Sequence, residues 1–248
     1  MQPYIVPQLE LRPPHYLPLL GCVAAALAVF LMCLLPVFFV NVMQTALDKL
    51  HLPGPVAGLA VLAILIGSMI NLPVYRMPRD ETQPEIVMGL VYFGMMAPQF
   101  RRVRQETVVA VNVGGCVVPA LLAAWQIRYL LQAGGQTALA LLAVCALSII
   151  VCWRVARPVA GIGIMMPAFI APLAAVGGTW LACSLWPGVG AENLAPIAFT
   201  AGVAGPIVGA DLFHLKDLLR TPVGVMSIGG AGTFDGIVLS GVLAALLA

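Results

Sequence analysis

Long apolar runs separated by short polar stretches dominate the chain. An α-helix needs about 20 residues to cross the ~30 Å hydrocarbon core of a bilayer, so the pattern predicts about seven transmembrane helices. A further run, residues 86–98, is too short and is interpreted as a re-entrant or interfacial segment. The seven runs cover residues 17–42, 55–74, 107–125, 137–153, 158–183, 195–212 and 229–248.

These runs predict an all-α fold, a polytopic membrane helix bundle. Residues 1–16 are expected to form a cytoplasmic N-terminal segment, and residues 17–248 a single transmembrane helical domain. No small-residue cleavage site follows the first run, so that run is expected to remain as an uncleaved helix.

Composition excludes an ordinary soluble domain, because 61% of the 248 residues are hydrophobic and only 9% are charged. A net charge of +2 is too balanced for a nucleic-acid partner. The expected surroundings are the lipids of a cell membrane, crossed several times, and the expected substrate is a membrane protein or a small solute.

The cysteines carry no sign of a metal site or of a disulfide framework. None has the paired spacing of zinc ligands, and all lie within apolar runs, so they are interpreted as small buried hydrophobes. We therefore expect no metal and no cofactor. The six are Cys22, Cys33, Cys116, Cys145, Cys152 and Cys183.

Basic residues assign the two sides of the predicted bundle. With seven spans, ten of the twelve Lys and Arg residues fall on one side, and only Lys49 and Arg128 fall on the other. The positive-inside rule then places the N-terminus in the cytoplasm and the C-terminus outside. The ten are Arg12, Arg76, Arg79, Arg101, Arg102, Arg104, Arg154, Arg157, Lys216 and Arg220.

Helix-breaking residues cluster inside four of the predicted spans. In hydrocarbon, such clusters indicate either close helix packing through small residues or unwound backbone that lines a wet cavity, and four together favour a cavity. Asn71, Asn112, Gly114 and Gly115 are candidates for binding a substrate or an ion, with hydrogen bonding between helices as the alternative. The clusters are Asn71–Pro73, Asn112–Gly115 with Pro119, Gly161–Gly163 with Pro167 and Pro172, and Gly202–Gly209 with Pro206.

Two aspartates are the strongest functional signal. Asp211 closes the sixth run, and Asp235 follows a glycine-rich stretch that opens the seventh. A helix starting at Gly236 would rise only ~20 Å, so it must start earlier or begin already submerged, and a start near Gly229 puts Asp235 about 9 Å below the cytoplasmic interface.

An aspartate inside a membrane is a functional-site hypothesis by default. Two carboxylates held close together share a proton, so one can act as a base and the other as an acid. Gly232 and Gly236 would let an extended substrate approach the backbone of this site closely. The structural alternative makes Asp211 a solvated helix end and Asp235 a helix cap.

The chain resembles an uncharacterised bacterial and archaeal family of multi-pass membrane proteins of unknown function. The resemblance rests on Gly229–Ile237, Ala156–Pro158 with Gly161–Gly163, and Asn112–Gly115. It implies no activity.

The segment from Asp235 onwards is also similar to the helix after the second catalytic aspartate of the presenilin and signal-peptide-peptidase group of intramembrane aspartyl proteases. That resemblance implies catalytic roles for Asp235 and Asp211. The group places Gly-x-Gly directly before this aspartate, whereas Thr233 and Phe234 intervene here, and Ala210 stands where the group has tyrosine before its first aspartate.

Three classes of function stay open on the sequence. The first is an aspartyl protease-like enzyme that hydrolyses membrane-embedded peptide bonds. The second is a secondary transporter with an intramembrane aspartate as proton or cation site. The third is a non-catalytic scaffold.

The predicted topology can be tested by labelling single cysteines in a cysteine-free background. A membrane-impermeant thiol reagent applied from outside should reach positions in the Trp186–Asn193 loop and should not reach positions in the Arg101–Arg104 cluster, because positively charged loops stay cytoplasmic. External labelling of the arginine cluster would overturn the assignment.

Overall fold

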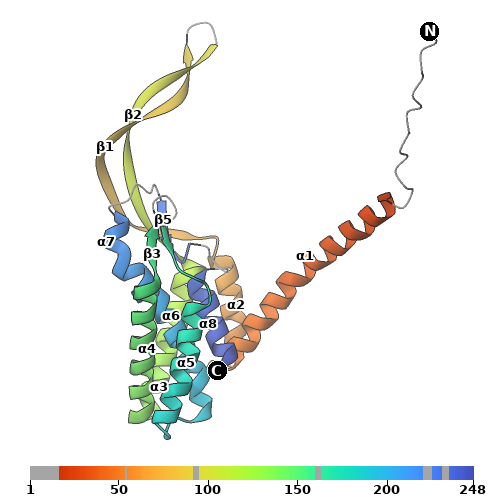
Figure 1. Cartoon of the computed structure of the whole chain (residues 1–248), viewed down its shortest axis with the longest axis vertical. Coiled ribbons are helices and arrows are strands. Elements are labelled where there is room, and N and C mark those ends of the chain that lie inside the picture. Colours follow the sequence, from red (N-terminus) through yellow and green to blue (C-terminus); the bar gives the residue numbers. More distant parts are fainter. Residues whose placement is uncertain (1–16, 54, 92–94, 160–162, 220–224, 231–234) are drawn as a thin grey trace, which may run out of the picture. The chain divides into compact units, whose positions relative to one another are not determined.

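The computed structural model describes residues 17–53, 55–91, 95–159, 163–219, 225–230 and 235–248 (Figure 1). The chain divides into two units, Met1–Asn41 and Val42–Ala248. Helix α1, Leu17–Asp48, begins in the first unit and ends in the second, with Pro36 inside it. The other described elements belong to the second unit.

Apolar helices form the body of the second unit. Helix α6 runs without interruption into the π-helical segment η4 and then into α7, and the π-helical turn η2 leads into α3. A 3₁₀ turn, η3 (Ala191–Asn193), precedes α6. The bounds are α2 Val56–Gly67, η2 Val113–Val117, α3 Val118–Gln132, α4 Gly135–Val155, α5 Ile170–Leu185, α6 Leu194–Ala204, η4 Gly205–Leu212, α7 Phe213–Leu219 and α8 Gly236–Leu247.

Strands link the helices at one end of the bundle. Strands β1 (Asn71–Val91) and β2 (Met95–Asn112) form a long antiparallel hairpin that leads away from the helices in Figure 1. Strand β5 (Val225–Ile228) adds to this sheet in parallel with Val108–Val111 of β2. Strands β3 (Arg157–Val159) and β4 (Gly163–Met165) form a separate antiparallel pair.

The predicted membrane helix bundle is confirmed. Four described helical stretches are long and apolar enough to cross a membrane: Gly21–Asp48, Val113–Gln132, Gly135–Val155 and Ala191–Asp217. Helices α2, α5 and α8 are apolar but shorter, since the runs that contain them are helical over only part of their length. The count of about seven spans therefore stays a prediction.

The sequence did not predict the sheet. Residues 86–91 and 95–98, interpreted as part of a re-entrant or interfacial segment, lie in the two strands of the β1–β2 hairpin. The predicted spans 55–74 and 107–125 likewise run into strand residues, because α2 ends at Gly67 and helical backbone resumes only at Val113. Pro73, Pro78 and Pro84 lack the backbone N–H that a helix interior requires, which disfavours helix across this region.

The predicted breaks in the helices are present. Backbone at Gly114–Gly115 is π-helical and follows a strand directly. Between Arg157 and Met165 the described backbone is extended, and Gly163 has a φ of +116°, which favours glycine. The segment from Gly205 to Leu212 is π-helical, with Pro206 in its first turn.

Glycines on α6, η4 and α8 allow unusually close packing between these elements and α4. A Cβ at Gly202 would lie 2.8 Å from the carbonyl oxygen of Ser240 on α8, and one at Gly241 would lie 2.7 Å from Val203. On the other side of the same segment, a Cβ at Gly209 would lie 3.0 Å from the backbone nitrogen of Trp153 on α4. The α6–η4 segment is therefore held between α8 and α4 by backbone contact.

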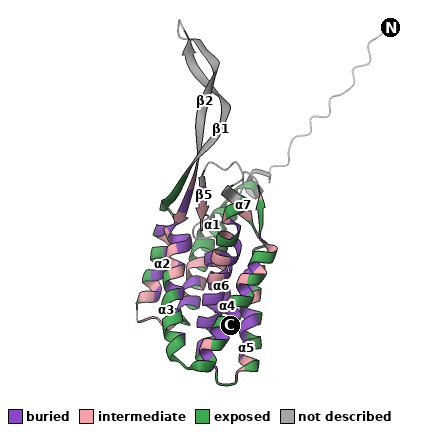
Figure 2. Cartoon of the chain, turned by 90° about the vertical axis from the view of Figure 1, so that its left-hand side faces the viewer, coloured by how far each residue is buried: buried purple, intermediate pink, exposed green. Residues whose placement is uncertain are grey.

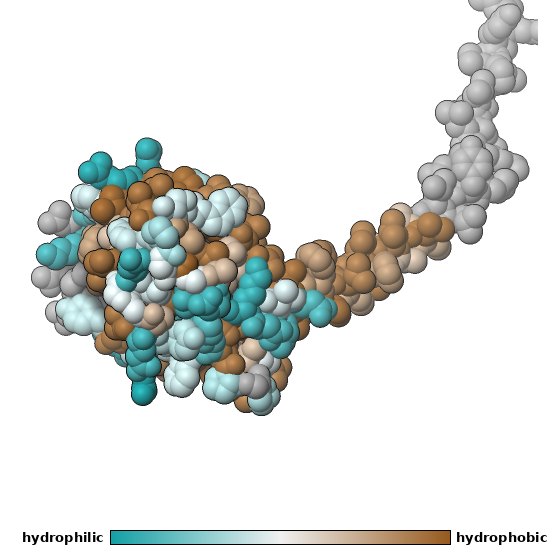
Figure 3. Space-filling model, turned by 90° about the horizontal axis from the view of Figure 1, so that it is seen from below, coloured by the Kyte–Doolittle hydropathy of each residue, from teal (hydrophilic) through white to brown (hydrophobic). Residues whose placement is uncertain are grey.

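Burial agrees with this arrangement. Buried residues gather where the helices face one another, and exposed residues occupy the outer faces (Figure 2). Many exposed side chains are large and apolar, such as Leu142 on α4 and Leu173 on α5. Hydrophobic residues also reach the outline of the bundle in the end-on view of Figure 3. An outer surface of this kind suits lipid rather than water.

The glycine contact between α6 and α8 makes a stability prediction. Gly202→Ala should destabilise the protein by about 1–3 kcal/mol, because the added methyl meets a backbone carbonyl that cannot move away cheaply. Thermal unfolding in detergent, followed by circular dichroism, measures the change.

Gly177→Ala on α5 is the matched control. A Cβ there meets nothing within 4 Å, so the higher helix propensity of alanine should leave stability unchanged or raise it by up to ~1 kcal/mol. Equal behaviour of the two variants would refute the importance of the α6–α8 contact.

Candidate active site between two broken helices

Asp211 is held in place by the packing of η4. Gly209 contacts the backbone of α4, and Ala210 is buried beside Cys152 and Ala171. Asp211 follows these two residues and is half-buried. Because the backbone before it is fixed against α4, the direction of its carboxylate is set by the helix and not by a loop.

Asp235 is the N-cap residue of α8. Its backbone is extended, with φ −69° and ψ 150°, and its Oδ1 accepts a hydrogen bond of 3.0 Å from the backbone nitrogen of Ile237. The structural alternative considered from the sequence, a helix cap, is therefore present. This bond satisfies one of the N–H groups that a helix start leaves without a partner.

Helix α8 begins within the bundle. Of the two alternatives from the sequence, an earlier start near Gly229 and a submerged start, the first is wrong, because strand β5 ends at Ile228 and helical residues begin at Gly236. Twelve residues rise about 18 Å, well short of the ~30 Å hydrocarbon core. At the other end of α8, Lys49 Nζ donates a 2.7 Å hydrogen bond to the carbonyl oxygen of Leu246. That end of α8 therefore lies beside Lys49, and the depth of Asp235 in the membrane stays a prediction.

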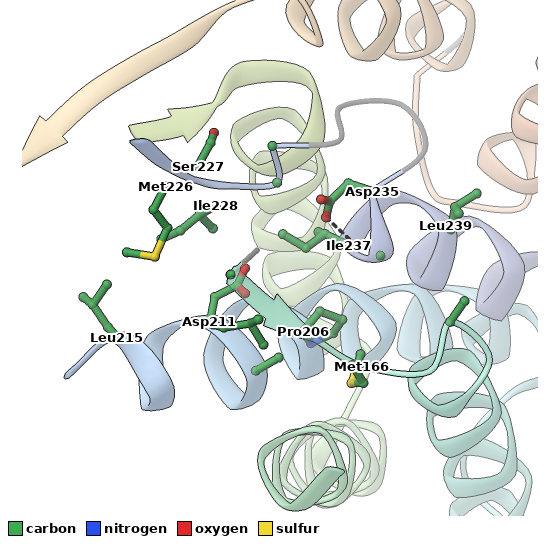
Figure 4. A pocket seen from close by; sticks show the side chains of 17 residues that line it. Met166, Pro206, Asp211, Leu215, Met226, Ser227, Ile228, Asp235, Ile237 and Leu239 are labelled. Carbon is green, nitrogen blue, oxygen red and sulfur yellow. Dashed lines mark hydrogen bonds between the residues drawn. The ribbon is translucent and has the colours of Figure 1, made fainter. Parts of the chain in front are cut away.

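Asp211 and Asp235 line the same cavity, which has a volume of about 480 Å³ (Figure 4). In the close-up, η4 contributes Asp211 and the start of α8 contributes Asp235. Apolar side chains, among them Met166, Pro206 and Ile237, form much of the remaining wall. The two acids therefore share a cavity whose wall has both polar and apolar parts.

Two strands that the sequence did not reveal complete the wall of the cavity. Gly163 and Ile164 come from β4, and Met226, Ser227 and Ile228 come from β5. The sequence signal for β5 is weak, a four-residue run between Gly224 and Gly229. Strand β5 pairs with β2, which lies more than a hundred residues earlier, and such a long-range pairing gives no pattern in the local sequence of either strand.

Asn112 and Asn71 act as structural links. Asn112 is fully buried, donates a 2.8 Å hydrogen bond to the carbonyl oxygen of Ser68, and accepts a 2.6 Å bond from the backbone nitrogen of Gly115. Its amide also donates to Asn71 Oδ1 at 3.1 Å, and Ser227 donates to the same oxygen at 2.7 Å. These contacts are those of the alternative role, bonding between elements, and neither asparagine lines the cavity. A binding role for them stays a prediction.

The candidate glycines separate into different environments. Gly114 packs against the backbone of α2, and Gly115 meets the turn at Gly229, whose φ is +70°. Gly236 is exposed, lines the cavity, and a Cβ there would meet nothing within 4 Å. Gly232 lies outside the described residues.

Within the described parts of the chain, no group of three or more His, Cys, Asp or Glu residues could hold a metal ion. His214, buried one turn after Ala210, uses its Nδ1 to donate a 2.9 Å hydrogen bond to the Ala210 carbonyl oxygen. Among the described residues that line the cavity, the ionisable side chains are those of Asp211 and Asp235.

The long apolar helices and the apolar outer surface make this chain a membrane protein. It belongs to a family described as proteins of unknown function (DUF1614), whose model matches residues 65–247. The resemblance to an uncharacterised family is thereby confirmed, and the match spans both aspartates. No curated protein and no solved structure matches the chain. The similarity to presenilin-type proteases stays a hypothesis.

The cap bond of Asp235 makes a second stability prediction. Asp235→Ala should lower the free energy of unfolding by about 1 kcal/mol, because Ile237 loses its acceptor. Asp235→Asn should stay close to the wild type, since the amide oxygen can accept the same bond. Thermal unfolding of both variants in detergent measures the difference. Asp217→Ala, on the exposed side of α7, is the control and should change nothing. A loss with Asn equal to that with Ala would contradict the cap.

Proposed function

We propose that this protein is a multi-pass enzyme of the cell membrane that hydrolyses peptide bonds with Asp211 and Asp235. The observation that carries the proposal is the shared cavity, into which both carboxyl groups are directed from packed helical elements. Two acids that line one cavity can divide the two roles of acid and base.

The proposed reaction needs only water besides the two acids. The ionised carboxylate takes a proton from water as the oxygen forms a bond with the peptide carbonyl carbon. The protonated carboxyl group gives its proton to the carbonyl oxygen, which forms a gem-diol. The acid formed in the first step then protonates the amide nitrogen as the C–N bond breaks. A diol hydroxyl returns its proton to the other carboxylate, which leaves a carboxylic acid and an amine.

The strands beside the cavity favour an extended peptide as substrate. Strand β5 pairs with β2 on one side and lies at the edge of the described sheet. An edge strand offers backbone N–H and C=O groups to an added strand, and a peptide must be extended before its bonds are open to attack by water. The apolar side chains in the wall, such as Met166 and Ile237, suit the side chains of a membrane-embedded substrate.

A transporter is the second candidate. The observation in its favour is the broken backbone next to the acids: η4 is π-helical at Asp211, and α8 starts at Asp235. Half-helices of this kind form ion sites in secondary transporters, where one carboxylate can carry the proton or cation. The two candidates differ in whether both acids are needed.

The test is cleavage of a membrane-spanning reporter by purified protein in lipid vesicles. Asp211→Asn and Asp235→Asn should each abolish cleavage, by a factor of at least about 10²–10⁴, because each removes one partner of the acid–base pair. Asn keeps the shape of the side chain, so helical content and unfolding temperature should stay close to the wild type.

Asp217→Asn is the matched control, since Asp217 lies on α7 outside the cavity, and it should keep full activity. If the wild type cleaves no reporter but shows ion-coupled uptake that depends on only one of the two aspartates, the transporter proposal replaces the protease proposal. If Asp211→Asn and Asp235→Asn both keep the cleavage and the ion-coupled uptake of the wild type, the protease and the transporter proposals are both excluded.

A further inference from the structure

A second groove, separate from the aspartate cavity, lies where α4 ends and η4 passes into α7. It has a volume of about 370 Å³ and is lined by Trp153, Leu212, Phe213 and Lys216. We propose that this groove binds the headgroup and upper acyl chain of an anionic phospholipid. The proposal does not depend on the function of the aspartates.

Two candidate spans end together at this groove. Gly135–Val155 ends two residues after Trp153, and Ala191–Asp217 ends one residue after Lys216. The two ends are adjacent because Gly209 packs against the backbone of α4 at Trp153. The Trp153 and Phe213 rings also meet edge to face, with centroids 6.4 Å apart. Aromatic side chains at the ends of spans are typical of the membrane–water interface.

Cationic groups surround these rings. The Arg154 guanidinium lies 5.1 Å from the centroid of the Trp153 ring, and Lys216 lines the groove itself. Arg157 is exposed at the start of β3, which contacts α7. The acids nearby are Asp217, which is exposed next to Lys216, and Asp211, which lines the other cavity. Three cations against one exposed acid favour an anionic ligand.

The apolar part of the groove selects a lipid. Leu212 is 47% exposed and Phe213 is 55% exposed, and both lie near the end of the candidate span Ala191–Asp217. An acyl chain can cover them while the phosphate lies between Lys216 and Arg154. A phosphate offers several acceptor oxygens to ammonium and guanidinium donors. By the positive-inside rule the groove lies on the cytoplasmic side, where anionic lipids attract basic residues.

Native mass spectrometry of the full chain in detergent tests the proposal. Phosphatidylglycerol and phosphatidylcholine with identical acyl chains are the probes. The wild type should bind phosphatidylglycerol more tightly than phosphatidylcholine. Lys216→Gln and Arg154→Gln should each weaken phosphatidylglycerol binding about 5-fold, and the double variant should weaken it about 25-fold, because independent free-energy losses add. Binding of phosphatidylcholine should change little in any variant.

Arg128→Gln is the matched control, because Arg128 is exposed on α3, on the side predicted to carry few cations, and it should behave like the wild type. Circular dichroism confirms that each variant is folded. Equal binding of the two lipids by the wild type would overturn the proposal without any variant. So would a double variant no weaker than Arg128→Gln, or displacement of phosphatidylglycerol by inorganic phosphate alone.

Discussion

Close backbone contact along α6 and η4 is the constraint on which the rest of the bundle depends. Lipid tails are as apolar as leucine, so helices in a bilayer gain little from hydrophobic burial against one another, and small residues that allow close approach drive their association. Gly202 meets the carbonyl of Ser240 on α8, and Gly209 meets the backbone of α4. The same continuous segment carries Asp211, so the contacts that hold the bundle together also fix one of the two acids.

The other acid is held at the start of α8. The first turn of this helix packs into the protein, where Ile237 and Val238 are buried, so its N–H groups need acceptors there. Asp235 supplies one of them to Ile237. A carboxylate can accept several hydrogen bonds, so the cap holds the side chain in place without using its whole capacity. The structural and chemical interpretations of Asp235 are therefore compatible.

Much of this arrangement was predictable because it depends on local pattern. Apolar runs indicated the helices, clusters of Gly and Pro indicated the breaks, and the sequence singled out Asp211 and Asp235, which line one cavity. The sheet was not predictable in the same way. Val108–Val111 pair with Val225–Ile228 across more than a hundred residues, and hydropathy alone cannot distinguish an apolar strand from an apolar helix. The partners of Asn71 and Asn112 were hidden for the same reason, since Ser227 and Ser68 reach them only in the fold.

Glycine clusters in a membrane protein can indicate close packing or an open cavity. In this protein, different glycines have different explanations. At Gly67 and Gly114 a side chain would collide with backbone, so packing explains glycine. At Gly163 the positive φ explains it. Gly236 has neither property: its φ is not positive, and a Cβ there would meet nothing within 4 Å. Since Gly236 lines the cavity directly after Asp235, the missing side chain leaves the first turn of α8 open on the side that faces the two acids.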